Sequence, residues 1–153
     1  MNELQVRIVH LEPMRVACAS GFGESPEREA WDKLLAWAES QRLEDLKAHR
    51  FFGFNNPDPS PGSPNYGYDQ WMTVGLDTEA AGEIKIIEFS GGLYAVARCE
   101  RLDNIGQVWK QLVTWREDSA YKQAHHQWLE ELLTPPATPP QDYVFDLYLP
   151  IAE

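Results

Sequence analysis

The chain has little cysteine, few positive charges and no long apolar run. Its 153 residues include two cysteines, and 13 basic residues stand against 24 acidic ones. Cys18 and Cys99 lie in apolar stretches without a CxxC pair, so we expect reduced core thiols. A net charge of −11 disfavours nucleic-acid partners, because nucleic-acid binding neutralises phosphates with lysine and arginine.

A membrane helix needs roughly 20 consecutive apolar residues, and no stretch approaches that length. The first residues also lack the positive-then-apolar order of a signal peptide. We therefore expect a cytoplasmic protein without membrane contact.

The common catalytic and cofactor motifs are absent too. Gly21 and Gly23 lack the third glycine of the dinucleotide-binding motif GxGxxG. The chain also has neither the phosphate-binding motif GK[ST] nor the serine-nucleophile motif GxSxG. His125 and His126 are adjacent, which puts their rings about 100° apart on a helix, whereas helical metal ligands favour i, i+4 spacing. We expect no metal and no cofactor, and we favour a binding protein over an enzyme.

What the chain does contain is an internal repeat. It is carried by three pairs of similar segments in the same order: 6–9 with 84–87, 31–37 with 109–115, and 68–74 with 145–151. Such a repeat constrains the architecture. We expect one domain over 1–153, built from halves at about 4–76 and 82–151, with a functional cleft at the seam.

The predicted order of elements is β-β-α-β-β in the first half and β-β-α-α-β in the second. Apolar, β-branched stretches predict strands, and i, i+3, i+4, i+7 spacing predicts helices. The expected strands are 4–11, 14–20, 50–55, 66–76, 84–89, 93–98 and 142–151, and the expected helices are 25–41, 103–117 and 121–133. Short turns between strands favour antiparallel pairing. The predicted class is α+β, with helices on a mainly antiparallel sheet and a pseudo-two-fold axis between the halves.

Acids and aromatic residues meet in the last strand of each half. Alternation puts Asp69 and Trp71 on one face and Tyr68 on the other, and the final strand repeats this with Asp146 and Tyr148. An acid among aromatic rings suits an apolar cation, with cation–π attraction of about 0.5–2 kcal/mol per contact. The same acid suits proton transfer. An exposed strand position is the open alternative for each acid.

These residues resemble a known family, the GyrI-like small-molecule-binding domain. It is also the effector-binding domain of AraC-type and MerR-type multidrug-responsive regulators. The resemblance spans nearly the whole chain and rests, besides the repeat, on 56–62 (NPDPSPG), 66–71 (YGYDQW), 128–131 (WLEE) and 146–151 (DLYLPI). It implies a tandem β-α-β-β fold, with helices against a curved antiparallel sheet and an aromatic pocket where the halves join.

The resemblance also implies site residues. A buried glutamate of the family meets lipophilic cations, and Glu130 matches it here. Asp69 and Asp146 stand where the family has glutamates, and the shorter side chain reaches less far, so Glu130 is the better candidate for direct contact. We expect Glu130 and Asp146 to supply charge, and the loops 56–65 and 134–141 to form the rim. The expected aromatic walls are Tyr68, Trp71, Trp109 and Tyr148. Core packing is the alternative for Trp109, because it lies at helical spacing.

Three functions are compatible with these expectations. The first is a stand-alone effector-binding or sequestering module for small apolar cations, without a DNA-binding segment before Leu4. The second is a hydrolase that adds water to cyclopropane-type electrophiles. The third is contact with a protein partner, either DNA gyrase or a regulator. The expected partner is a small molecule, with no direct nucleic-acid contact.

Overall fold

The computed structural model describes residues 4–43, 48–56, 65–135 and 138–153. Most of the loop 56–65 and part of the loop 134–141 lie outside the described residues, so their predicted role as a rim stays a prediction. By their internal contacts the residues form two compact units. Unit 1 comprises Met1–Pro13 and Ser90–Glu153, and unit 2 comprises Met14–Phe89.

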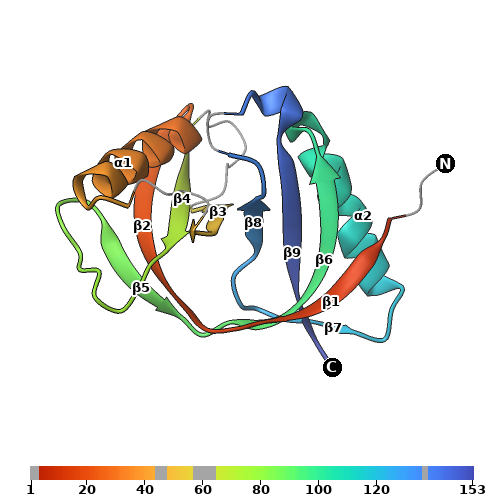
Figure 1. Cartoon of the computed structure of the whole chain (residues 1–153). Coiled ribbons are helices and arrows are strands. Elements are labelled where there is room, and N and C mark those ends of the chain that lie inside the picture. Colours follow the sequence, from red (N-terminus) through yellow and green to blue (C-terminus); the bar gives the residue numbers. More distant parts are fainter. Residues whose placement is uncertain (1–3, 44–47, 57–64, 136–137) are drawn as a thin grey trace. The chain divides into compact units, whose positions relative to one another are not determined.

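Unit 2 is an antiparallel sheet with one helix against it. Its strands lie in the order β3-β4-β2-β5 and are β2 (Met14–Gly23), β3 (Phe51–Asn55), β4 (Tyr66–Thr73) and β5 (Lys85–Phe89). Helix α1 (Pro26–Ser40) lies along β2 and β4 (Figure 1). It begins at Pro26 after Ser25, as the preference of proline for the first helical position predicts.

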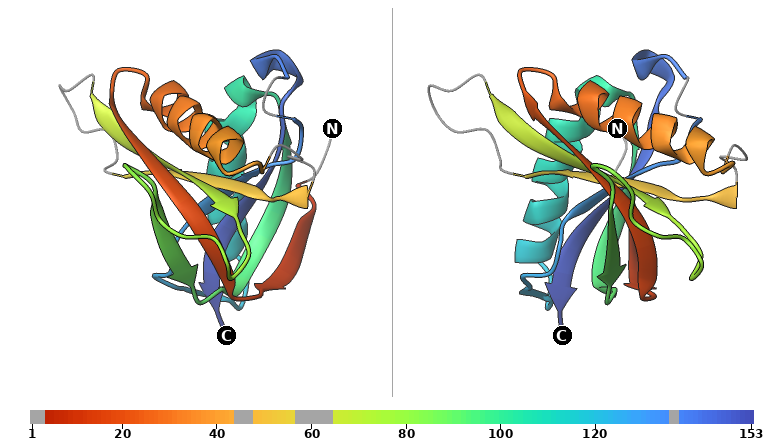
Figure 2. Two further views of the ribbon diagram at one scale, coloured as in Figure 1. Left: turned by 60° about the vertical axis from the view of Figure 1, so that its left-hand side comes forward. Right: turned by 90° about the vertical axis from the view of Figure 1, so that its left-hand side faces the viewer.

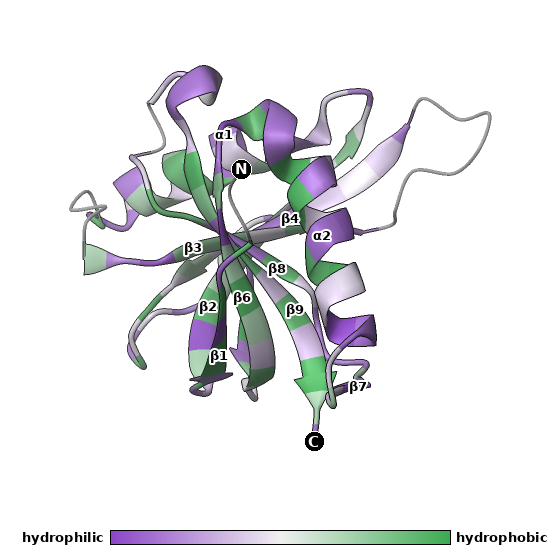
Figure 3. Ribbon diagram, turned by 90° about the vertical axis from the view of Figure 1, so that its right-hand side faces the viewer, coloured by the Kyte–Doolittle hydropathy of each residue, from purple (hydrophilic) through white to green (hydrophobic). Residues whose placement is uncertain are grey.

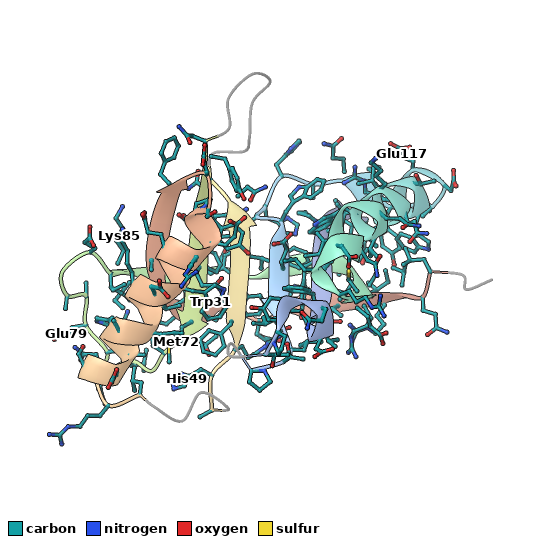
Figure 4. All side chains as sticks on the ribbon, turned by 90° about the horizontal axis from the view of Figure 1, so that it is seen from above. Trp31, His49, Met72, Glu79, Lys85 and Glu117 are labelled. Carbon is teal, nitrogen blue, oxygen red and sulfur yellow. The ribbon has the colours of Figure 1, made fainter. Side chains whose placement is uncertain are left out.

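Helix α1 packs on the sheet through its apolar side. Leu34 of α1 is fully buried and shares a core cluster with Ala17 of β2 and Met72 of β4. Met72, labelled in Figure 4, therefore faces α1. Because side chains alternate along a strand, the neighbouring Cys18 and Trp71 belong to the opposite face of this sheet.

Unit 1 has the same construction. Its strands lie in the order β1-β6-β9-β8, with a short β7 paired to the end of β9. They are β1 (Val6–Leu11), β6 (Gly92–Glu100), β7 (Lys122–Gln123), β8 (Leu129–Leu132) and β9 (Val144–Ala152). Helix α2 (Ile105–Glu117) packs on β6 and β9 (Figure 2), after the 3-10 helix η2 (Leu102–Asn104). A second 3-10 helix, η3 (Pro140–Asp142), precedes β9.

Helix α2 is amphipathic, as its purple and green bands in Figure 3 show. Leu112 on its inner side is fully buried, and Glu117 at its end is exposed (Figure 4). No helix within the described ranges is long and apolar enough to span a membrane.

The two units confirm the predicted α+β class and the tandem β-α-β-β order, but they exchange their first strands. β2-α1-β3-β4 corresponds to β6-α2-β8-β9. The edge strand beside β2 is β5, from the second half of the sequence, and the edge strand beside β6 is β1, from the first half. Each folded unit therefore contains the first strand of the other sequence half.

The helix predicted for 121–133 was wrong. Residues of this stretch form β7 and β8, which pair with 151–152 and 145–148 of β9. The apolar spacing from Tyr121 to Leu132 fits a helix, and a four-residue strand is too short to show its own period. Pairing with β9 provides backbone partners for β8, and this tertiary context outweighs the local pattern.

We expect Gly91→Ala to destabilise the fold. Gly91 has a φ of +78°, and an added Cβ would lie 2.1 Å from the carbonyl oxygen of Leu11. The strain should lower the free energy of unfolding by about 1–3 kcal/mol in urea titrations. Gly106→Ala in α2 is the control, because a Cβ there meets nothing within 4 Å. It should be neutral or stabilising by up to about 1 kcal/mol, and equal effects of the two changes would contradict this account.

Candidate functional site

The sheet of unit 1 has one face toward α2 and another turned away from it, here called the far face. The indole Nε1 of Trp109 in α2 donates to Oε2 of Glu130 at 3.1 Å, so Glu130 points toward α2. Glu131 follows it in β8 and points the opposite way. Glu131 stands opposite Asp146 of β9, which puts Asp146 and Tyr148 on the far face as well.

Glu131 and Tyr148 form the central contact of this face. The hydroxyl of Tyr148 donates to Oε1 of Glu131 at 2.7 Å, and the two residues are 4% and 6% exposed, respectively. Tyr94 packs edge-on against Tyr148, with ring centroids 5.4 Å apart, and edge-on against His126 at 4.8 Å. The result is a buried carboxylate bonded to Tyr148, whose ring packs in turn against Tyr94.

Tyr94 is itself fixed by its hydroxyl, which donates to the backbone oxygen of Gln127. Burial raises the pKa of Tyr94, so this hydroxyl keeps its proton and remains a donor. His126 also bonds the backbone, through Nε2 and the oxygen of Leu93 at 2.8 Å. Tyr94, beside Tyr148, and His126, beside Tyr94, are therefore both held by hydrogen bonds to the main chain.

Asp146 is held by two arginines. Nη2 of Arg7 lies 2.8 Å from its Oδ2, and Nε of Arg98 lies 2.8 Å from its Oδ1. The hydrogen bond to Asp146 raises the pKa of Arg98 above its usual value, so the guanidinium stays charged. Both carboxylate oxygens of Asp146 are thus paired with guanidinium groups of unit 1.

The far face of unit 2, turned away from α1, carries the other predicted pair. Trp71 packs against Phe54 and Phe89, with ring centroids 5.1 and 5.2 Å away. Asp69 accepts hydrogen bonds from Oγ of Ser20 at 2.6 Å and from Nδ2 of Asn56 at 3.1 Å. Neutral donors satisfy this acid, in contrast to Asp146.

The other predicted site residues lie on the helix sides of the sheets. Tyr68 shares the α1 side with Met72 and lies over Gly53, where an added Cβ would come within 2.1 Å of its hydroxyl. Trp109 and Glu130 bond each other on the α2 side. The structure thus groups Asp146 with Tyr148, and Asp69 with Trp71, and places the remaining three predicted residues beside the helices.

Sequence reasoning missed Glu131, Tyr94 and His126. Glu131 is part of the WLEE stretch, but the helix predicted there hid the strand alternation that pairs it with Asp146. Tyr94 lies in the predicted strand 93–98, whose apolar run does not distinguish one face from the other. Within the described part of the chain, no group of three or more histidine, cysteine or acidic side chains forms a metal site.

Comparisons with known proteins agree with this architecture. A family model described as the GyrI-like small molecule binding domain matches residues 4–152. The chain belongs to this GyrI-like family. A DNA gyrase inhibitor of Escherichia fergusonii is 31% identical over 111 residues, which cover 69% of this chain and 70% of that protein. The resemblance seen in the sequence is thereby confirmed.

Solved structures share the GyrI-like fold at low identity. The EcmrR C-terminal domain has a TM-score of 0.74 and 12% identity, covering 98% of both chains. A protein solved with bound tetraphenylphosphonium has a TM-score of 0.54 and 11% identity, covering 98% of this chain and 94% of that chain. Likeness at this identity shows the fold alone, so the roles of site residues rest on the geometry of this chain.

We expect both thiols to be unreactive in the folded protein. Cys18 pairs across the strands with Trp71, and burial raises the pKa of Cys18 and of Cys99 to about 11. Since the thiolate is the reactive form, alkylation by iodoacetamide at mildly alkaline pH should be roughly 100-fold slower than for an exposed cysteine. Unfolding in urea should restore the ordinary rate, and fast labelling of the folded chain would contradict the burial.

Proposed function

We propose that the domain binds small, apolar, cationic compounds on the far face of unit 1, with Glu131 as the acid that meets their positive charge. The GyrI-like family is one of small-molecule-binding domains. The observation that carries the proposal is the hydrogen bond from Tyr148 to Glu131, which holds a buried carboxylate in a fixed position beside the packed rings of Tyr148 and Tyr94. A ligand cation gains more from a carboxylate in such surroundings than from one in water.

The aromatic residues supply the apolar part of the binding energy. Tyr94 packs between Tyr148 and His126, so a flat ligand that reaches these rings gains contact area and cation–π attraction of about 0.5–2 kcal/mol per ring. Tetraphenylphosphonium, bound by one protein of the same fold, belongs to this class of lipophilic cation.

The predicted site residues take different roles in this proposal. Tyr148 orients Glu131, and Asp146 fixes Arg7 and Arg98. Glu130, the acid first favoured, is assigned to the contact between β8 and α2, because it accepts from Trp109. Contacts of a ligand with residues of unit 2 stay predictions.

The two adjacent glutamates provide a matched test. Titration calorimetry with tetraphenylphosphonium should show that Glu131→Gln weakens binding about ten-fold or more, because a charge-assisted contact contributes about 1.5–3 kcal/mol. Glu130→Gln removes the same charge one residue away and should leave the affinity within about two-fold.

Equal losses in the two variants would indicate a general charge effect and contradict the assignment of Glu131. A larger loss in Glu130→Gln would return the role to Glu130. Thermal melts of both variants serve as the folding control.

Gyrase inhibition is a second candidate, favoured by the name of the Escherichia fergusonii relative. It predicts that a molar excess of this protein slows the supercoiling of relaxed plasmid by DNA gyrase. Glu131→Gln should inhibit as well as the wild type if the protein contact is separate from the ligand site. Unchanged supercoiling at a large excess of the protein would remove this candidate.

A further inference from the structure

Four charged side chains form a row across the far face of unit 1. From one strand to the next they are Arg7 on β1, Arg98 on β6, Asp146 on β9 and Glu131 on β8. Arg98, Asp146 and Glu131 stand directly opposite one another in register, and Arg7 stands opposite Val96, two residues before Arg98. Neighbouring strands lie about 4.8 Å apart, so the row changes from positive to negative over roughly 14 Å.

The two arginines retain donors for a further partner. Asp146 uses Nη2 of Arg7 and Nε of Arg98, and a guanidinium has several other N–H groups. The side chains of Arg7 and Arg98 are 52% and 55% exposed, whereas that of Asp146 is 7% exposed. The buried acid therefore holds both guanidinium groups in place while about half of each arginine side chain stays exposed.

Three negative charges oppose an anion at this place, because Asp146, Glu131 and Glu100 all act on Arg98. Glu100 follows Arg98 on the same face of β6 and is exposed. Its field is screened by water and salt, whereas donors that touch an anion act by direct contact. Two arginines and three acids meet here, so an anion is favoured by direct donation from the guanidinium N–H groups and not by net charge.

We propose that Arg7 and Arg98 form an oxyanion subsite beside Glu131, so that unit 1 selects apolar zwitterions over plain cations. This inference rests on the proposed cation-binding role of Glu131 and narrows its ligand class. A ligand carboxylate accepts charge-assisted hydrogen bonds from the arginines, which match its planar geometry. Its cationic group, about two strand spacings or roughly 10 Å away, meets Glu131.

A matched pair of dyes tests the preference. A rhodamine ethyl ester is a cation, and the same rhodamine with a free carboxylate is a zwitterion at neutral pH. Fluorescence anisotropy with the wild type should give the free acid an affinity about five- to ten-fold higher than that of the ester.

The decisive variant combines Arg98→Gln with Asp146→Asn, which removes the paired charges together and leaves no buried carboxylate unpaired. It should reduce the preference to about two-fold or less while ester binding is retained. Lys110→Gln removes an exposed positive charge from α2 and should keep the wild-type preference. If the double variant fails to fold by circular dichroism, Arg7→Gln replaces it, because that side chain is half exposed.

The outcomes separate the two proposals. Equal affinity of the wild type for both dyes, or a preference that survives in the folded Arg98 and Arg7 variants, overturns the oxyanion subsite and leaves cation binding at Glu131 intact. Ester binding that does not weaken in Glu131→Gln overturns the proposed function and the subsite with it.

Discussion

Two carboxylates stand opposite each other on neighbouring strands, and the far face of unit 1 depends on how their repulsion is offset. Asp146 and Glu131 are both buried, and like charges directly opposite in a sheet are destabilising. Arg98 reaches Asp146 from β6, and Arg7 reaches it across β6 from β1. The charge balance of the candidate site therefore requires the strand that the first half of the sequence contributes.

The two units differ chemically because equivalent positions of the repeat carry different residues. By the repeat spacing, Ser20 and Asp69 correspond to Arg98 and Asp146, and each pair is in direct register. One copy satisfies its acid with a hydroxyl and an amide, and the other with two guanidinium groups. Arginine in place of serine at this cross-strand position gives Asp146 one charged partner, and Arg7 of β1 provides the second.

The sequence predicted the order of elements well, because helix starts, β-branched runs and turns are local signals. Pro26 begins α1 as expected, and alternation correctly separates Trp71 from Met72. Two features could not be predicted from the sequence. β8 is too short to reveal a period, so Glu131 was hidden within a helical pattern. A repeat shows which strands are equivalent, but not which copy each strand joins, because similar strands fit either edge.

The exchange of first strands also affects the order in which the strands can pair during synthesis. β1 leaves the ribosome first, but its partner β6 begins only at Gly92, after the whole of unit 2. During that interval β1 has both edges unpaired, while 14–89 already contains every strand of its own sheet. Closing so long a loop is slow, and contacts of high sequence separation form late. The sequence repeat and the folding unit are thus offset by one strand, and a fragment cut at the repeat boundary would separate each edge strand from its sheet.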